Sequence, residues 1–284
     1  MIIWLASYPK SGNTWVRSFL TTVLYSVDGE NSFEHLYKIK QFPLSTQLNN
    51  YIDDYKDMGQ LARSWLIAQQ AINLDGKIKL FKTHHVNCKI DNQPFTDLDN
   101  TLGVVHIVRD PRNVVTSIKN HYSLPNIKAA KNFLLDDNMW IQRPEKERDQ
   151  NDGRVVPTLI SSWKTNYQSW KNKSKNYLLI RYEDLVNNPF ESFKKICEYI
   201  SKLMDIEIKD EKIEKAILTN SFEKLKKLEE MGKFDEYKVR LKTEKEFKFF
   251  NLGPNNSWEK ILDKETIDDI QNSFSIEMKE LNYV

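Results

Sequence analysis

The chain has 284 residues and a formal net charge of +2, which is long enough to bury a substantial core. Its balanced charge argues against a dedicated duplex-DNA binder, because such proteins usually carry a strong basic excess. No stretch approaches the roughly 20 apolar residues that span a bilayer, and no secretory signal is visible. We therefore expect a cytoplasmic protein without integral membrane association or a nucleic-acid partner. We also expect its cysteines, Cys88 and Cys197, to be reduced.

Short apolar runs alternate with helical patterns along the chain. The runs that predict strands are 2–6, 78–81, 103–108 and 176–181. The patterns that predict helices are 14–25, 59–73, 113–122, 159–170 and 189–203. This alternation favours an α/β fold with a central parallel sheet flanked by helices. We expect a single domain over residues 1–284, with its ligands at the carboxyl ends of the strands.

Three further segments are polar or charged. Residues 125–157 are polar and predict either a surface excursion that acts as a lid or an ordinary solvated loop. Residues 206–246 are rich in Lys and Glu and predict solvated helix faces with i,i+4 pairs. Residues 263–281 predict a final helix.

The first predicted strand is followed by a polar turn, SYPKSGNT, at residues 7–14. This turn is not the nucleotide-kinase pattern G-x-x-x-x-G-K-[ST], because Lys10 precedes Gly12. Gly12 nevertheless allows the backbone to approach an anion, and successive N–H groups at a helix start can converge on it. Ser11 and Thr14 add hydroxyl donors, and Lys10 adds a positive charge. The turn therefore predicts an anion site.

The same stretch, YPKSGNTW at residues 8–15, resembles the 5′-phosphosulfate loop of sulfotransferases that use 3′-phosphoadenosine 5′-phosphosulfate (PAPS). The usual form of that loop is YPKSGTTW, and only Asn13 departs from it, keeping a polar side chain. The resemblance implies a P-loop NTPase-like fold, PAPS as the donor, adenosine 3′,5′-bisphosphate (PAP) as the product and no required metal. The donor-binding residues that it implies in this loop are Lys10, Ser11, Gly12, Asn13, Thr14 and Trp15.

A donor of this kind carries a 3′-phosphate, which needs a second anion site. The stretch HIVRDPRNVVTS at residues 106–117 resembles the family's 3′-phosphate motif, which implies that Arg109 and Ser117 bind that phosphate. The structural alternative is an ion pair between Arg109 and Asp110 within the turn.

The stretch LFKTHH at residues 80–85 also follows a strand. In the resembled family a K-T-H motif stands here, which implies that His84 is the general base and Lys82 an electrostatic stabiliser. His85 is the competing base, since a shift of one residue would exchange the two. His106 lies within a predicted strand and is expected in the core. His121 follows the phosphate helix and is a candidate to line the acceptor pocket.

Two aromatic residues complete the resemblance to the donor site. Tyr182 in YLLIRYEDL and Phe222 in TNSFEKLK match residues that contact the adenine in the family. The structural alternatives are a buried tyrosine at the end of a strand and an ordinary core phenylalanine.

The clearest departure from the family lies near the C-terminus. The family has R-K-G-x-x-G-D-W there, whereas this chain has NLGPNNSW, with Asn251 and Leu252 in place of the Arg-Lys pair. Gly253 keeps its place, and its N–H group can still contribute to phosphate binding. Other cations can replace the missing pair, or donor affinity is reduced. The candidate replacements are Arg240, Lys242 and Lys248.

The function that the resemblance implies is in-line transfer of a sulfuryl group from PAPS to a hydroxyl or amine of a small-molecule, lipid or glycan acceptor. Lys10, Lys82 and His84 would be the catalytic residues. One alternative is a P-loop nucleotide or sugar kinase, which the position of Lys10 counts against. The other is a nucleotide-binding protein without turnover, which the loss of the Arg-Lys pair at 251–252 favours.

Overall fold

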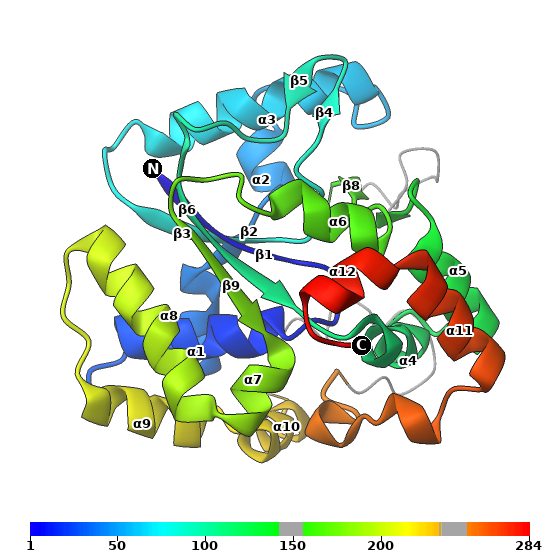
Figure 1. Ribbon diagram of the computed structural model, residues 1–284. Helices are drawn as coiled ribbons and strands as arrows, with labels where there is room; N and C mark the ends of the chain where they lie inside the picture. Colours follow the sequence, from blue (N-terminus) through cyan, green and yellow to red (C-terminus); the bar gives the residue numbers. More distant parts are fainter. Residues whose placement is uncertain (142–155, 233, 235–248) are drawn as a thin grey trace. The chain divides into compact units, whose positions relative to one another are not determined.

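The computed structural model describes residues 1–141, 156–232, 234 and 249–284 (Figure 1). The chain divides into two compact units. The first consists of Met1–Asn13, Ile39–Val108 and Phe133–Ile180. The second consists of Thr14–Lys38, Arg109–Asn132 and Arg181–Val284.

The first unit is built on a five-stranded sheet with the order β2-β3-β1-β6-β9 (Figure 1). Its strands are β1 (Ile2–Ser7), β2 (Lys40–Gln41), β3 (Lys79–Thr83), β6 (Thr101–Val108) and β9 (Tyr177–Arg181). β1 pairs in parallel with both β3 and β6, and β2 pairs in parallel with β3. Parallel neighbours need long crossovers, which explains the alternation of strands with helices in the sequence. The predicted α/β fold with a parallel sheet is confirmed.

The core of the first unit forms around Trp4 in the central strand. All six side chains of β1 are buried, and its first five residues, 2–6, form a continuous apolar run. The Trp4 ring lies 5.6 Å from the Phe42 ring and 6.0 Å from the Trp170 ring, while its Nε1 donates to Thr101 Oγ1 at 3.0 Å. The remaining elements of this unit are α2 (Ser45–Leu48), α3 (Met58–Asn73), β4 (Lys89–Ile90), β5 (Gln93–Pro94), β7 (Trp140–Ile141), β8 (Thr158–Leu159) and α6 (Trp163–Trp170).

The second unit is helical. The described α-helices that lie wholly or mostly in it are α1 (Asn13–Tyr25), α4 (Pro111–His121), α5 (Ile127–Leu135), α7 (Tyr182–Asn187), α8 (Pro189–Met204), α9 (Asp210–Thr219), α10 (Phe222–Glu230), α11 (Lys264–Ser273) and α12 (Ser275–Glu280). The described residues between them include the 3₁₀ turns η1 (Phe33–Lys38), η3 (Gly253–Asn255) and η4 (Trp258–Lys260). Helices α1 and α8 pack through Phe19 and Phe193, whose ring centroids are 4.1 Å apart.

The structure differs from the predicted elements at several points. The helix expected over 159–170 starts at Trp163, because the Ser162 hydroxyl accepts the Thr165 N–H and caps the helix there. The helix expected over 263–281 is two helices, which meet at Phe274 with a φ of −121°. The edge strand β2 was not predicted, because its two residues are polar.

Other expectations fall partly outside the described residues. Within 125–157 the structure describes α5 and β7, while 142–155 lie outside the described residues, so the lid stays a prediction. The single domain over residues 1–284 also stays a prediction. Within 206–246 the charged helices α9 and α10 are confirmed. Both cysteines are free thiols, as expected. Among the helices that the structure describes, none is both long and apolar enough to cross a membrane.

Candidate functional site

The loop after β1 has an unusual backbone. Lys10 has a φ of +66° and Gly12 a φ of +97°, so both residues are in the left-handed region. For a lysine this conformation costs about 1–2 kcal/mol, whereas glycine adopts it freely. Left-handed residues alternating with right-handed ones turn successive N–H groups toward one side, which creates a concavity for an anion. Two left-handed residues within three positions are typical of such an anion-binding backbone, and the anion site itself stays a prediction.

The side chain of Asn13 fixes this loop to the preceding strand. Its Nδ2 donates to the Leu5 carbonyl at 2.9 Å and to Ser7 Oγ at 3.1 Å. The Ser11 side chain is fully buried, and its hydroxyl has no hydrogen-bond partner among the described residues. A buried hydroxyl without a partner is unfavourable, so a ligand oxygen at this loop would satisfy it.

His84, directly after β3, contacts the end of β1. Its Nδ1 lies 2.8 Å from the Ser7 carbonyl oxygen and 3.2 Å from Ser7 Oγ. Because a carbonyl oxygen only accepts, Nδ1 carries the proton, and Nε2 of the neutral ring holds the lone pair. This tautomer is the one that a general base acting through Nε2 requires.

His85 occupies a different environment from its neighbour. Its side chain is fully buried, with its ring stacked on Phe95 at 4.3 Å and edge-on to Trp65 at 4.7 Å. Its Nδ1 lies 2.6 Å from the Val86 carbonyl oxygen, and burial lowers the pKa of His85 to about 4. The structure thus separates the two candidate bases, with His84 at the strand ends and His85 in the aromatic core.

Two other residues predicted around these strands are buried. Lys82 in β3 is 7% exposed and lies in register with Leu5 of β1. His106 in β6 is in the core, as expected, with Nδ1 2.8 Å from the Tyr177 hydroxyl. Burial lowers the pKa of His106 to about 3.

In the second unit, Arg109 follows directly after β6 and its side chain is buried. Its guanidinium carbon lies 4.1 Å from the centre of the Tyr182 ring, a cation–π contact. Its Nη2 donates to the Gly253 carbonyl at 3.5 Å. The Tyr182 and Trp15 rings form a T-shaped pair with a centroid separation of 5.9 Å. Four residues that the sequence analysis singled out are therefore neighbours.

Phe222 joins this group through Gly253. Gly253 has a φ of +53°, and a Cβ atom at this position would lie 2.3 Å from a Phe222 ring carbon. Only glycine allows the phenylalanine ring to approach the loop so closely. Trp15, Tyr182, Arg109, Gly253 and Phe222 therefore form one contiguous cluster, called here the Arg109 cluster.

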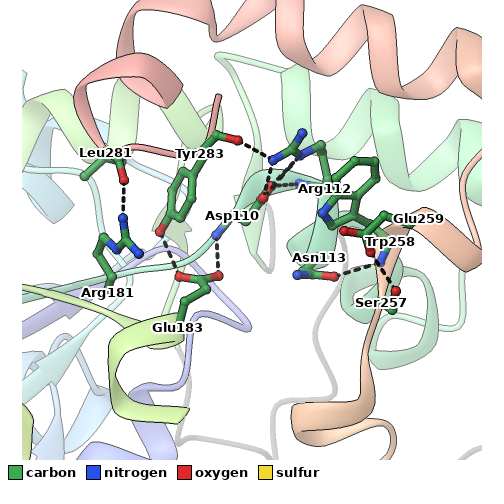
Figure 2. Close-up of polar contacts among 10 residues, drawn as sticks. All are labelled: Asp110, Arg112, Asn113, Arg181, Glu183, Ser257, Trp258, Glu259, Leu281 and Tyr283. Carbon is green, nitrogen blue, oxygen red and sulfur yellow. Dashed lines mark hydrogen bonds and ion pairs between the residues drawn. The ribbon is translucent and has the colours of Figure 1, made fainter. Parts of the chain in front are cut away.

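Among the described residues, the ion pair of the Asp110 carboxylate is with Arg112 and not with Arg109, which was the alternative predicted from the sequence. The carboxylate binds Arg112, with Nη2–Oδ2 at 2.6 Å and Nε–Oδ1 at 3.0 Å (Figure 2). It also accepts the Arg112 backbone N–H at 2.9 Å, which caps the start of α4. The guanidinium of Arg109 is instead directed at Tyr182 and Gly253.

Ser117 lies half-buried on α4. The loop that contains Asn256 and Trp258 is hydrogen-bonded to the same helix. The Asn256 amide donates to the Asn113 carbonyl at 2.8 Å and accepts from the Thr116 hydroxyl at 2.8 Å. The Trp258 N–H donates to Asn113 Oδ1 at 3.0 Å. Sequence reasoning missed Asn113, Thr116 and Asn256, because nothing in their local pattern indicates partners about 140 residues away.

The residues that replace the family's Arg-Lys pair are at the surface. Asn251 and Leu252 are exposed. The candidate replacements Arg240, Lys242 and Lys248 lie outside the described residues, so their role stays a prediction. In the part of the chain that is described, no group of three or more His, Cys, Asp or Glu side chains could hold a metal ion.

Comparison with known proteins agrees with this geometry. The model of the sulfotransferase domain family matches residues 2–282. Dog (Canis lupus familiaris) sulfotransferase 1B1 is 24% identical over 224 residues, which cover 78% of this chain and 65% of that protein. Firefly (Photinus pyralis) luciferin sulfotransferase is 23% identical over 250 residues, which cover 84% of this chain and 60% of that protein. The matches thus span less than two thirds of these relatives.

Solved structures show the same fold. A mouse sulfotransferase complexed with PAP superposes with a TM-score of 0.58 at 20% identity, over 98% of this chain and 84% of that chain. Retinol dehydratase in complex with androsterone and PAP superposes with a TM-score of 0.60 at 18% identity, over 98% and 80%. The P-loop-like form of the α/β fold is therefore confirmed, and by its family match the chain belongs to the sulfotransferase domain family.

Proposed function

We propose that this chain is an enzyme that transfers a sulfuryl group from PAPS to a hydroxyl or amine of an acceptor molecule. The observation that carries the proposal is the loop between β1 and α1, with left-handed Lys10 and Gly12 and the buried hydroxyl of Ser11. It combines the backbone of an anion site with the sequence of the family's 5′-phosphosulfate loop. The family match over residues 2–282 supports the same reading.

The proposed base is His84. Its Nε2 takes the proton of the acceptor hydroxyl while the acceptor oxygen attacks sulfur. The bond between sulfur and the bridging oxygen of the 5′-phosphate then breaks, and Lys10 neutralises the charge that develops on that oxygen. Lys82 and the loop N–H groups hold the sulfuryl oxygens. Each such electrostatic contact is typically worth about 3–4 kcal/mol of the barrier.

The nucleotide end of the donor is assigned to residues of the second unit. Arg109 and Ser117 bind the 3′-phosphate, together with the Gly253 N–H group, and Trp15, Tyr182 and Phe222 contact the adenine. The clustering of Arg109, Gly253 and three aromatic side chains supports this assignment, since a guanidinium binds a phosphate bidentately and aromatic faces stack on a base. At the 5′ end of the donor, the Asn13 side-chain amide holds the loop in place, and the Thr14 hydroxyl is a further proposed donor of a hydrogen bond to PAPS.

The acceptor is proposed to be a small molecule. One relative is named for luciferin, and one structural neighbour is in complex with androsterone, which are both small molecules. His121 lies edge-on to Phe249, with a centroid separation of 5.6 Å, and both are proposed to line the acceptor site. The cytoplasmic location also stays a prediction.

The experiment that tests the donor is calorimetric titration with PAP and with ATP, each with and without Mg²⁺. Tight, metal-independent binding of PAP over ATP supports the proposal and rules against the kinase alternative. Transfer of labelled sulfate from PAPS to a panel of phenols and alcohols then separates an enzyme from a binding protein. Preference for ATP with Mg²⁺ would contradict the proposed donor.

A further inference from the structure

The last residues of the chain bind the two segments from which the Arg109 cluster projects. The Arg181 guanidinium donates to the Leu281 carbonyl at 2.7 Å, and the Arg112 guanidinium donates to the Tyr283 carbonyl at 2.6 Å (Figure 2). The Tyr283 hydroxyl donates to Glu183 Oε2 at 3.0 Å. Residues 281–283, called here the C-terminal latch, thus contact both segment 110–112 and segment 181–183.

Glu183 is the centre of this arrangement. Its Oε2 receives the Tyr283 hydroxyl, and its Oε1 receives the Asp110 N–H at 3.0 Å (Figure 2). Asp110 and Glu183 directly follow Arg109 and Tyr182, the pair that is stacked at 4.1 Å. One carboxylate therefore joins the backbone next to Arg109 to the backbone next to Tyr182.

Arg112 extends the arrangement to the loop that carries Gly253. Its guanidinium binds Asp110, donates to the Tyr283 carbonyl and lies 4.0 Å from the centre of the Trp258 ring. A buried guanidinium is tolerated only when its N–H groups are satisfied, and Tyr283 supplies one of the acceptors. The latch therefore stabilises the position of α4 and of Trp258 together.

We propose that Glu183 and Tyr283 are positioning residues, which hold Arg109 against Tyr182 in the geometry that binds the 3′-phosphate of the donor. This inference rests on the proposed function, because it takes Arg109 as the 3′-phosphate ligand. Bidentate binding of a phosphate by arginine is sensitive to displacements of less than about 1 Å, so a fixed backbone on either side of the guanidinium strengthens it.

The decisive measurement compares two nucleotides that differ only in the 3′-phosphate. PAP and adenosine 5′-monophosphate are titrated calorimetrically into the 284-residue chain and its variants. The readout is the dissociation constant of the monophosphate divided by that of PAP, a ratio that falls when the 3′-phosphate is bound less well. In Tyr283→Phe we expect PAP to bind about five- to tenfold more weakly, because a hydrogen bond to a charged group is lost. Binding of the monophosphate should stay unchanged.

Two further variants separate positioning from stability. Glu183→Ala removes both acceptors and should reduce the ratio more than Tyr283→Phe does. Glu183→Gln can still accept from Asp110 and contact Tyr283, so it should keep most of the ratio. The matched control is Tyr55→Phe, which removes a hydroxyl hydrogen bond to Asn49 Oδ1 at 2.6 Å in the other unit. This control should leave both dissociation constants unchanged.

Each outcome has one meaning. If Arg109→Ala lowers the ratio while Tyr283→Phe and Glu183→Ala keep it, the latch is not a positioning device, although the proposed function stands. If the latch variants weaken both nucleotides equally, the effect is general destabilisation and the inference is wrong. If the unaltered protein does not prefer PAP, the role of Arg109 fails and the inference fails with it.

Discussion

The Nδ1 atom of His84 lies 2.8 Å from the carbonyl oxygen of Ser7, so the end of β1 fixes the tautomer of the residue that follows β3. The parallel register Ala6↔Thr83 brings the two strand ends to this distance. In this tautomer of the neutral imidazole, Nε2 is the basic atom. A rigid strand pair is a more exact support for such a side chain than a loop.

The first prediction concerns this histidine and its neighbour. His84→Ala should lower kcat for sulfuryl transfer by at least about a hundredfold, as expected for loss of a general base. His85→Phe keeps an aromatic ring against Phe95 and should retain kcat, once the folded fraction is confirmed by thermal melting. Near-normal turnover in His84→Ala, or a selective loss of kcat in His85→Phe, would reverse the assignment.

The second prediction concerns the loop backbone. Gly12→Ala places a side chain at a φ of +97°, which should weaken PAP binding more than about tenfold, because the N–H groups lose their common direction. Gly76→Ala is the matched control, since Gly76 also has a positive φ, +69°, and open space around its Cβ position. Gly76→Ala should lower the melting temperature only through the strain of an alanine at a positive φ, and it should leave PAP affinity unchanged. Equal PAP affinities in the two variants would count against the loop as an anion site.

The third prediction concerns Gly253 and Phe222. Gly253→Ala forces a Cβ to 2.3 Å from the phenylalanine ring and should weaken PAP binding by about tenfold or more. In a Phe222→Leu background, which itself weakens adenine binding, Gly253→Ala should cost less PAP affinity than it does in the unaltered protein, if the clash is the cause. Gly232→Ala, at a φ of +68° with nothing within 4 Å, controls for backbone strain. An equal cost of Gly253→Ala in both backgrounds would show that the clash does not determine affinity.

The fourth prediction concerns stability in acid. His85 and His106 have pKa values of about 4 and about 3, both lowered by burial from the usual 6.5. The unfolded chain therefore binds protons as the pH falls below about 6.5, while the folded chain does not until far lower pH. The free energy of unfolding should decrease by up to about 1.4 kcal/mol per pH unit for each histidine.

Urea denaturation at about pH 7.5, 6 and 5 measures this dependence. His85→Phe should give a flatter curve than the unaltered protein, because one of the two groups no longer titrates. A stability that is constant over this interval would show that neither histidine is excluded from protonation in the folded state.

The sequence predicted the strand–helix alternation well, since it depends on local patterns. A buried strand is a run of apolar residues. The separation of His84 from His85 could not be predicted, because it depends on where β3 ends against β1. Neither could the pairing of Asp110 with Arg112 rather than Arg109, because both arginines are near it in sequence.

The hydrogen bonds between segments that are distant in the sequence could not be predicted from it. Glu183 joins residues 110 and 283, and Asn256 joins a late loop to α4. None of these side chains belongs to a pattern with a period or a fixed spacing. The polar residues that hold the Arg109 cluster in place therefore became visible only in the folded chain.

The left-handed conformation of Lys10 has a consequence for how this protein can change. A glycine at this position would fold with less backbone strain, so Lys10→Gly is expected to raise the melting temperature while removing the charge assigned to the leaving phosphate. Selection of variants for heat resistance alone would then favour the loss of this lysine, whereas selection for turnover would keep it. At residue 10, thermal stability thus favours glycine, whereas catalytic activity favours lysine.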